Sequence, residues 1–338
     1  MAATRPEATN GSPRYGLGRP REGGEPVEDG RHASGSGGDR PPGGGDAPAA
    51  PPRVEAVVVL AGQVRANPLR RATGRGTLEL PLAPGHTVLD EWNEQLAAYA
   101  AAHEGPRPLP VRVMLDQEAD FDRRPRCPEA LDLGLERDPS RLRGTGGLLS
   151  DLARDYPDDA VLLVVHASQL PIRPLAEVLT RNRLRAGADV TLVCTADGQP
   201  SGVMLFRCGA LRGLKPVGFI DLNEQALPRI AQEADVRVCR TSRPATMSLR
   251  TTAGYLETLR AFHAGRSGSL EATGPFSESW RPAFQVIESG ASVAPGAVIH
   301  DSAVLSGARV DTHAVVVRSV IGPGAVVAPG QHVIDTVL

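Results

Sequence analysis

The C-terminal part of the sequence carries a six-residue repeat, and this repeat restricts the possible folds more than any other feature. Small and aliphatic residues recur at that interval in three series: Ala291, Ala297, Ala303; Val293, Ile299, Leu305; and Val298, Val304, Val310, Val316. Gly or Pro-Gly corners lie between them, as at Pro295-Gly296, Gly307, Gly322-Pro323-Gly324 and Pro329-Gly330. Such a period is typical of a parallel β-helix, in which each hexad forms one side of a coil. We therefore predict a β-helix over residues 286–338.

The predicted β-helix is short. If each coil takes three hexads, residues 286–338 form fewer than three coils. A stack of this length leaves an end with unpaired backbone and four apolar residues, Val333, Ile334, Val337 and Leu338. We therefore expect homo- or hetero-oligomerisation through this end of the β-helix.

A different pattern precedes the repeat. Continuous β-branched and aliphatic runs predict strands buried on both faces; they span residues 54–60, 111–115, 160–165, 189–194 and 202–206. Segments with helical periodicity occupy residues 88–102, 145–155, 173–184, 221–232 and 255–262. This alternation predicts an α/β fold with βαβ units and a mostly parallel sheet. Ligands of such sheets bind at the carboxyl ends of strands, so the residues after Leu60 and Val165 form the candidate site.

Composition divides the chain into four segments. Residues 1–52 hold 12 Gly and 9 Pro and almost no large apolar residue, so we expect a disordered tail. An α/β domain is expected over residues 53–263, a Gly/Ser-rich linker over 264–285, and the β-helix over 286–338.

Charge and composition exclude several classes of partner. The formal net charge is −2, from 37 basic and 39 acidic residues, so no basic field attracts nucleic acid or anionic lipid. Aromatic residues make up only 4%, which disfavours stacking on single-stranded nucleic acid. No stretch approaches 18 apolar residues and no apolar segment follows the first charges, so we expect neither a membrane span nor a signal peptide.

Cysteine and lysine usage limit the chemistry. The four cysteines, Cys127, Cys194, Cys208 and Cys239, are widely spaced, which disfavours zinc and disulfide frameworks and suits a reducing cytoplasm. We accordingly predict a cytoplasmic protein. Lys215 is the one lysine among the 37 basic residues. It is expected to be a solvent-exposed loop residue, so any chemistry that needs a lysine elsewhere lacks one.

The chain resembles the sugar-1-phosphate nucleotidyltransferases (NDP-sugar pyrophosphorylases of the mannose-1-phosphate guanylyltransferase type) that carry a C-terminal left-handed β-helix. The resemblance covers about residues 54–338 and rests on VVVLAG at 57–62, GTGG at 144–147, DLNEQALPRI at 221–230, and the hexads. It implies a Rossmann-like domain that couples a nucleoside triphosphate to a sugar 1-phosphate and releases pyrophosphate.

The phosphate-binding motifs of this family are altered here. Where the family reads L-A-G-G-x-G-T-R-L-x-P-L, this chain has a loop two residues shorter, with one glycine at that turn, Gly62. The resemblance implies nucleotide binding by Ala61, Gly62 and Gln63 and a catalytic role for Arg65, which is equally well explained as a solvated loop arginine. The family's phosphate-binding lysine is replaced by Thr77.

The two metal-binding aspartates of the family are replaced by Ser168 and Ser248. Because Mg²⁺ prefers anionic oxygen ligands, the resemblance predicts no metal site and no cofactor; Mg²⁺ is expected only in an active enzyme. His166, two residues before Ser168, is expected to be structural or solvated. The family's E-K-P loop is reduced to Asp197–Pro200.

The GTGG turn, Gly144, Thr145, Gly146 and Gly147, approaches the nucleotide base in the family. In this chain it has two equally supported interpretations, namely residual nucleotide binding or a tight entry turn into a helix.

These losses favour a degenerate family member, a pseudoenzyme that binds a nucleotide or nucleotide sugar or acts as a regulatory or scaffolding subunit. The alternative is a divergent active nucleotidyltransferase with a rearranged metal site built from Asp116, Asp158 or Asp159. A third hypothesis is acyl transfer by histidines of the repeats, namely His300, His313 and His332, although the stack is short for an acyl-carrier cleft.

Overall fold

The structure is a computed structural model, and it describes residues 53–62, 68–103, 105–117, 121, 126–138, 142–181, 188–215, 218–266 and 283–338. All of these belong to one compact unit, Pro48–Leu338. The predicted tail over 1–52 and most of the predicted linker over 264–285 lie outside the described residues.

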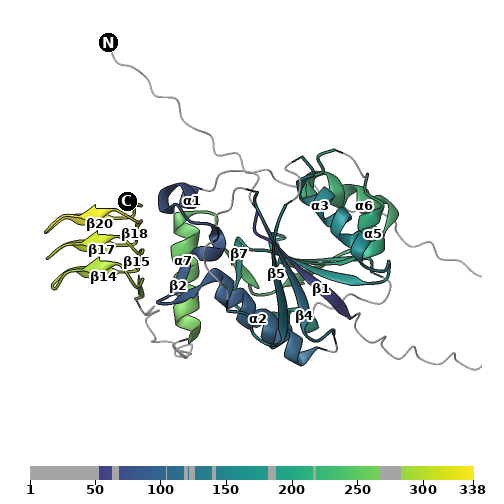
Figure 1. The fold of residues 1–338 in the computed structure, drawn as a ribbon, viewed down its shortest axis with the longest axis horizontal. Helices are drawn as coiled ribbons and strands as arrows, with labels where there is room; N and C mark the ends of the chain where they lie inside the picture. Colours follow the sequence, from purple (N-terminus) through teal and green to yellow (C-terminus); the bar gives the residue numbers. More distant parts are fainter. Residues whose placement is uncertain are drawn as a thin grey trace, which may run out of the picture. The chain divides into compact units, whose positions relative to one another are not determined.

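A seven-stranded sheet forms the centre of the α/β part (Figure 1). Its strands, in spatial order, are β10 (Val236–Thr241), β8 (Val190–Thr195), β9 (Pro200–Arg207), β6 (Val161–His166), β1 (Val54–Leu60), β4 (Leu109–Leu115) and β5 (Leu131–Arg137). Strand β9 is antiparallel to both neighbours, and the other four pairings are parallel. The predicted mostly parallel α/β sheet is confirmed.

Helices cover both faces of the sheet. Val57 and Val59 of β1 join the core beneath α2 (Val88–Ala102), α4 (Leu175–Arg181) and α7 (Thr252–Arg266). Val58 and Leu60 join the core beneath α3 (Gly144–Leu152), α5 (Cys208–Arg212) and α6 (Leu227–Glu233). The unbroken apolar run of β1 is therefore explained, because successive side chains enter two different cores.

Short elements connect these layers. They are α1 (Pro68–Thr73), the 3₁₀ turns Thr77–Glu79 and Ala153–Asp155, the π-helical turn Leu222–Ala226, and two antiparallel pairs, β2 (Pro81–Ala83) with β3 (His86–Thr87) and β7 (Gln169–Pro171) with β11 (Thr246–Ser248). The helix predicted at 221–232 is thus a π turn followed by α6. Pro228, which lacks an amide donor, lies in the first turn of α6.

The C-terminal part is a parallel β-helix, as predicted (Figure 1). Its three sheets are β12 (Gln285–Ile287), β15 (Ser302–Val304) and β18 (Val320–Ile321); β13 (Ser292–Val293), β16 (Arg309–Val310) and β19 (Val326–Val327); and β14 (Val298–His300), β17 (Val315–Val317) and β20 (His332–Ile334). Paired residues lie 17 positions apart, for example Ser292 and Arg309.

Each coil therefore takes 17 residues, whereas three hexads require 18, and each sheet has three layers rather than fewer. The shortening occurs at one corner, where a single residue with positive φ connects two strands. The equivalent residues of the three coils are Asp301 (φ 48°), Arg318 (φ 46°) and Asp335 (φ 52°). One residue in the left-handed region turns the chain from one sheet into the next with fewer residues than a Pro-Gly corner needs.

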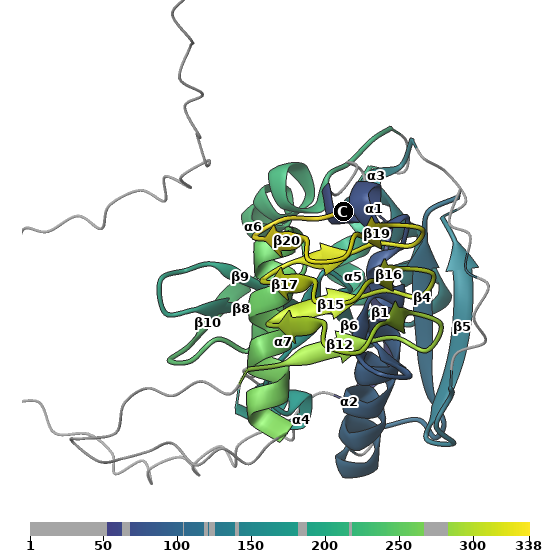
Figure 2. The same ribbon diagram turned by 90° about the vertical axis from the view of Figure 1, so that its left-hand side faces the viewer.

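The β-helix shares its core with the α/β part. Val286 and Ala303 are fully buried in the same apolar cluster as Leu259 and Phe262 of α7. Arg260 of α7 donates to Asp301 at 2.9 Å, and both views place α7 beside the β-helix (Figures 1 and 2). The contact is polar as well as apolar, so the two parts stabilise one another.

Candidate functional site

The carboxyl ends of β1, β4 and β6 meet at one edge of the sheet, where the sequence predicted the site. The amides of Ala61 and Gly62, which follow β1, both donate to the carbonyl of Met114, at 2.9 and 3.0 Å. Asp116, which follows β4, lies against Gly62, because a Cβ on that glycine would be 2.9 Å from the Asp116 carboxylate. Gln63 and Arg65 lie outside the described residues.

Asp116 is engaged by an arginine. Arg70 of α1 donates from Nη1 to Asp116 Oδ2 at 3.1 Å. Asp158 and Asp159 lie elsewhere, in a turn before β6, which starts at Val161 and ends at His166. They therefore lie at the amino edge of the sheet, a strand length away from Asp116. Of the aspartates proposed for a rearranged metal site, Asp116 is the one that lies at the carboxyl edge.

The two serines that the resemblance assigns to metal positions come together. Ser168 precedes β7 and Ser248 ends β11, and these strands pair with Ser248 opposite Gln169. The amide of Leu249, next to Ser248, donates to the carbonyl of Ser168 at 2.8 Å. Two positions that are 80 residues apart in the sequence thus lie side by side, and both carry hydroxyls.

His166 is the last residue of β6, and its side chain is half-buried. Burial lowers its pKa, and the positive charge of Arg250 lowers it further, while the carboxylate of Asp221 acts in the opposite direction. These charges place Arg250 and Asp221 near the imidazole. The expected structural or solvated role of His166 stays a prediction.

Asp221 is also the cap of the π-helical turn. Its Oδ1 accepts hydrogen bonds from the amides of Asn223 and Glu224, both at 2.8 Å. These bonds satisfy two amides at the start of the turn.

The GTGG turn is explained by chain packing. Gly144 has φ 66°, and a Cβ on it would lie 2.5 Å from the carbonyl oxygen of Ile220. A Cβ on Gly146 would lie 2.8 Å from Ala226, and the Thr145 hydroxyl accepts from the Leu222 amide at 3.2 Å. This supports the interpretation as a tight entry turn of α3, whose glycines admit the 220–226 segment. Nucleotide binding there stays a prediction.

At the positions that the resemblance assigns to lysines, this chain has Thr77 and the short turn at Asp197–Pro200. Thr77 is buried in the 3₁₀ turn before β2. Asp197 and Gly198 form the tight turn between β8 and β9, in which the Gly198 amide donates to Thr195 at 3.0 Å. Lys215 is exposed, as predicted.

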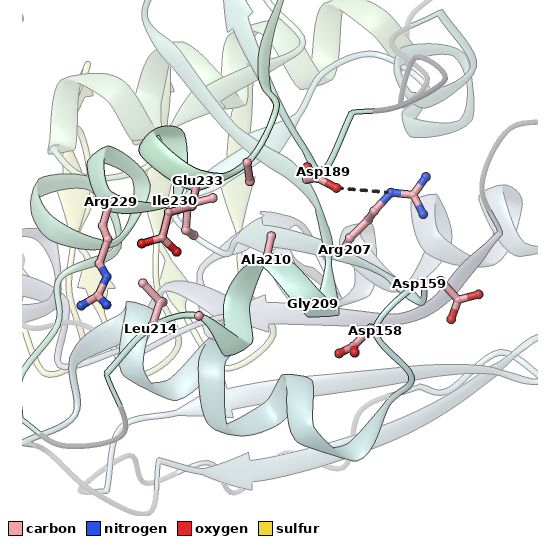
Figure 3. A pocket seen from close by; sticks show the side chains of 12 residues that line it. Asp158, Asp159, Asp189, Arg207, Gly209, Ala210, Leu214, Arg229, Ile230 and Glu233 are labelled. Carbon is pink, nitrogen blue, oxygen red and sulfur yellow. Dashed lines mark ion pairs between the residues drawn. The ribbon is translucent and has the colours of Figure 1, made fainter.

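A groove of 590 Å³ opens at the amino edge of the sheet, between α5 and α6 (Figure 3). It is lined by Asp158, Asp159 and Glu233, and by Asp189, which forms an ion pair with Arg207 at 3.9 Å. Because α/β sheets bind ligands at the opposite edge, we do not place the candidate site here.

The histidines of the acyl-transfer hypothesis are dispersed. His300 and His332 lie on β14 and β20, two layers apart, and both are exposed. His313 occupies a corner with φ 58°. The structure therefore gives this hypothesis no support.

Sequence reasoning missed one group of metal-ligand type. His86 of β3 and Glu91 and Glu94 of α2 have ligand atoms within 4.8 Å of one another. The one sequence signal for this group is the spacing of Glu91 and Glu94, since residues three apart lie on the same face of a helix. A cationic side chain already lies next to this group. Arg266 of α7 is 3.8 Å from the carboxylates of both Glu91 and Glu94. The network connects β3, α2 and α7.

All four cysteines are free, in agreement with the sequence. Among the described residues, no helix has the length and apolar character needed to cross a bilayer.

No family model and no curated protein matches the chain. Among solved structures, HddC from Yersinia pseudotuberculosis is similar at a TM-score of 0.45 with 12% identity, covering 62% of this chain and 100% of that one. A homologue of Mycobacterium tuberculosis rv0371c, from Mycobacterium sp. strain JC1, is similar at a TM-score of 0.39 with 19% identity, covering 62% and 98%. With TM-scores below 0.5, the functional argument rests on the residues of this chain.

Proposed function

We propose that the chain is a sugar-phosphate nucleotidyltransferase-like protein that binds a nucleotide or nucleotide sugar at the carboxyl edge of its sheet and lacks ordinary nucleotidyl transfer. The observation that carries the proposal is the juxtaposition of Ser168 and Ser248 across β7 and β11. The family's metal positions, taken from the resemblance, are adjacent in space, as a shared metal site requires, but neither side chain is anionic.

The chemistry explains why binding can persist without catalysis. Phosphoryl-type transfer depends on positioning and on neutralising charge, and loss of one preorganised donor commonly costs about 10²- to 10³-fold in rate. Here the metal carboxylates are serines and the lysine position is the buried Thr77. Asp116, which follows β4, forms an ion pair with Arg70. Ligand binding needs fewer of these groups than transfer does.

The deciding experiment measures pyrophosphate release by the purified full chain with Mg²⁺, the common nucleoside triphosphates and a panel of sugar 1-phosphates. We expect no release above a protein-free control. Turnover that Arg65→Ala abolishes would establish the alternative, a divergent active enzyme. Thermal unfolding with UDP-, ADP- and GDP-sugars then tests binding, since a ligand at 100 times its Kd stabilises the fold by about 2.7 kcal/mol.

A matched pair of variants tests the assignment of the serines. In the double variant Ser168→Asp with Ser248→Asp, two carboxylates return to adjacent positions, and we expect stabilisation by millimolar Mg²⁺ that the wild-type protein does not show. The control is the double variant Ser168→Asn with Ser248→Asn, which matches the size of the new side chains without their charge. Equal Mg²⁺ responses of the two double variants would contradict the assignment.

A further inference from the structure

Three polar side chains at the carboxyl edge have no protein partner among the described residues. The imidazole of His166, the hydroxyl of Ser168 and the guanidinium of Arg250 form no hydrogen bond or ion pair with another described residue. They belong to the end of β6, the turn before β7, and the segment after β11. Side chains this close to a sheet edge and without partners are suited to bind a ligand.

The backbone holds these three groups in one place. The hydrogen bond from the Leu249 amide to the Ser168 carbonyl, 2.8 Å long, fixes Arg250 one residue away from the β6–β7 turn. Ser248 supports this segment, because its hydroxyl accepts from the Arg250 amide at 3.4 Å. The position of Arg250 therefore follows from the β7–β11 pairing.

A glycine lies close to Cβ of His166 and to the side chain of Gln169. Gly202, near the start of β9, has φ 72°. A Cβ at this position would lie 3.2 Å from Cβ of His166 and 2.8 Å from Cγ of Gln169. The absence of a side chain on Gly202 thus allows His166 and Gln169 to lie over the start of β9.

An unpaired cation lies at this place. Within the part of the chain that the structure describes, Arg250 is exposed and unpaired, whereas Arg70, Arg75 and Arg143 each form an ion pair with a carboxylate. The carboxylate near His166, that of Asp221, is already bound by two amides. An anion with several oxygen acceptors would satisfy the guanidinium fork, the imidazole and the hydroxyl together.

We propose that Arg250, His166 and Ser168 bind the diphosphate group of the ligand, with Arg250 as the principal anchor. This inference rests on the proposed function, because it assigns the residues that hold the phosphates of the nucleotide sugar. Arg250 donates two parallel N–H groups to phosphate oxygens, the imidazole of His166 donates one N–H, and the Ser168 hydroxyl donates a further hydrogen bond. No lysine and no metal ion is needed for this arrangement.

The test is isothermal titration of the full chain with UDP-, ADP- and GDP-sugars and, separately, with inorganic pyrophosphate. We expect Arg250→Gln to weaken binding by about 10- to 100-fold, as the loss of charge-assisted hydrogen bonds predicts, and His166→Gln by about 10-fold. Arg309→Gln and His332→Gln, two exposed positions of the β-helix, are matched controls and should bind as the wild type does. Thermal unfolding without ligand confirms that each variant is folded.

The outcomes separate this inference from the proposed function. If nucleotide sugars bind and Arg250→Gln binds them equally well, the diphosphate assignment is wrong and the proposed function stands. If pyrophosphate binds through Arg250 and no nucleotide sugar binds, the anion site stands and the proposed function is wrong. If the wild type binds none of these compounds, both are wrong. In Gly202→Ala the new Cβ would lie 3.2 Å from Cβ of His166 and 2.8 Å from Cγ of Gln169, so this variant should weaken pyrophosphate binding as His166→Gln does.

Discussion

Glu288 accepts a hydrogen bond from Arg75 at 2.7 Å and thereby fastens the first coil of the β-helix to the α/β part. The second oxygen of the same carboxylate accepts from the amide of Ser306, also at 2.7 Å. Both side chains of the ion pair are largely buried, at 22% and 14% exposure. The Glu288 carboxylate therefore stabilises both the contact with the α/β part and the turn that contains Ser306.

Removal of this carboxylate should destabilise the whole unit. Glu288→Ala leaves the Arg75 guanidinium and the Ser306 amide without their acceptor, and we expect a loss of about 2–4 kcal/mol in the free energy of unfolding. Arg309→Ala, which breaks an exposed pair with Asp311, should cost less than about 1 kcal/mol. Urea denaturation measures both, and equal losses would contradict the role of Glu288.

The central strands could be predicted because a strand that is buried on both faces has a continuous apolar sequence. Strands β1 and β6 lie between two cores, so their sequences are unbroken apolar runs. The edge strands β5 and β10 were not predicted. Only one side chain of each is buried, and polar residues alternate along them, as in LDLGLER of β5. Such segments resemble loops until a neighbouring strand is known.

The same contrast holds for the candidate site. The resemblance predicted that Ser168 and Ser248 belong together, and the β7–β11 pairing places them side by side. Arg250 was not predicted. It is one of 36 arginines, and whether an arginine has a partner depends on contacts that no local pattern encodes. The 17-residue coil was not predicted either. A one-residue corner shortens each coil but leaves the six-residue spacing of the neighbouring segments unchanged.

The glycines of the GTGG turn give a test of structural against ligand-binding roles. In Gly144→Ala the new Cβ would lie 2.5 Å from a backbone oxygen, so we expect a loss of about 2–4 kcal/mol. Gly198 also has positive φ, at 86°, but has open space around its Cα, so Gly198→Ala should cost only about 1 kcal/mol. Chemical denaturation without ligand measures the difference. A stable Gly144→Ala protein that loses nucleotide binding would instead favour the ligand-binding interpretation.

His313 should be a site of stabilisation. It adopts φ 58°, while the equivalent corners one coil before and after it are Gly296 and Gly330. His313→Gly removes the strain of a side chain in the left-handed region, and we expect a gain of about 0.5–1 kcal/mol. His332→Gly, within β20, should instead lose about 0.5–1 kcal/mol. A loss at both positions in urea denaturation would show that the His313 side chain contributes contacts of its own.

Stability should fall as the pH drops below neutrality. Burial lowers the pKa of both His166 and His263 below the ordinary histidine value of about 6.5; nearby arginine charge adds to this, and the Leu82 carbonyl partly opposes it for His263. The unfolded chain therefore binds more protons than the folded one from about pH 6.5 down to the folded pKa values. The free energy of unfolding should rise with pH in that window.

Single substitutions show which histidine causes this pH dependence of the free energy of unfolding. His166→Gln and His263→Gln should each flatten the dependence of the free energy of unfolding on pH between about pH 5 and 7.5, measured by urea denaturation. His332→Gln, at an exposed position, should keep the wild-type slope. A slope that survives the double variant His166→Gln with His263→Gln would assign the proton uptake to other groups.

The last coil of the β-helix offers the test of oligomerisation. Of the four apolar residues expected at this end, Val333 is buried inside the coil and Val337 packs against the α/β core, whereas Ile334 and Leu338 are exposed at 49% and 43%. Exposed aliphatic residues beside an open sheet end favour association.

Deleting the β-helix is unsuitable as a test of this association, because it would expose shared core residues. We expect Ile334→Lys with Leu338→Lys to lower the sedimentation coefficient of the full chain, and Val298→Lys in the first coil to leave it unchanged. A wild-type protein that sediments as a monomer at every concentration would exclude association through this end.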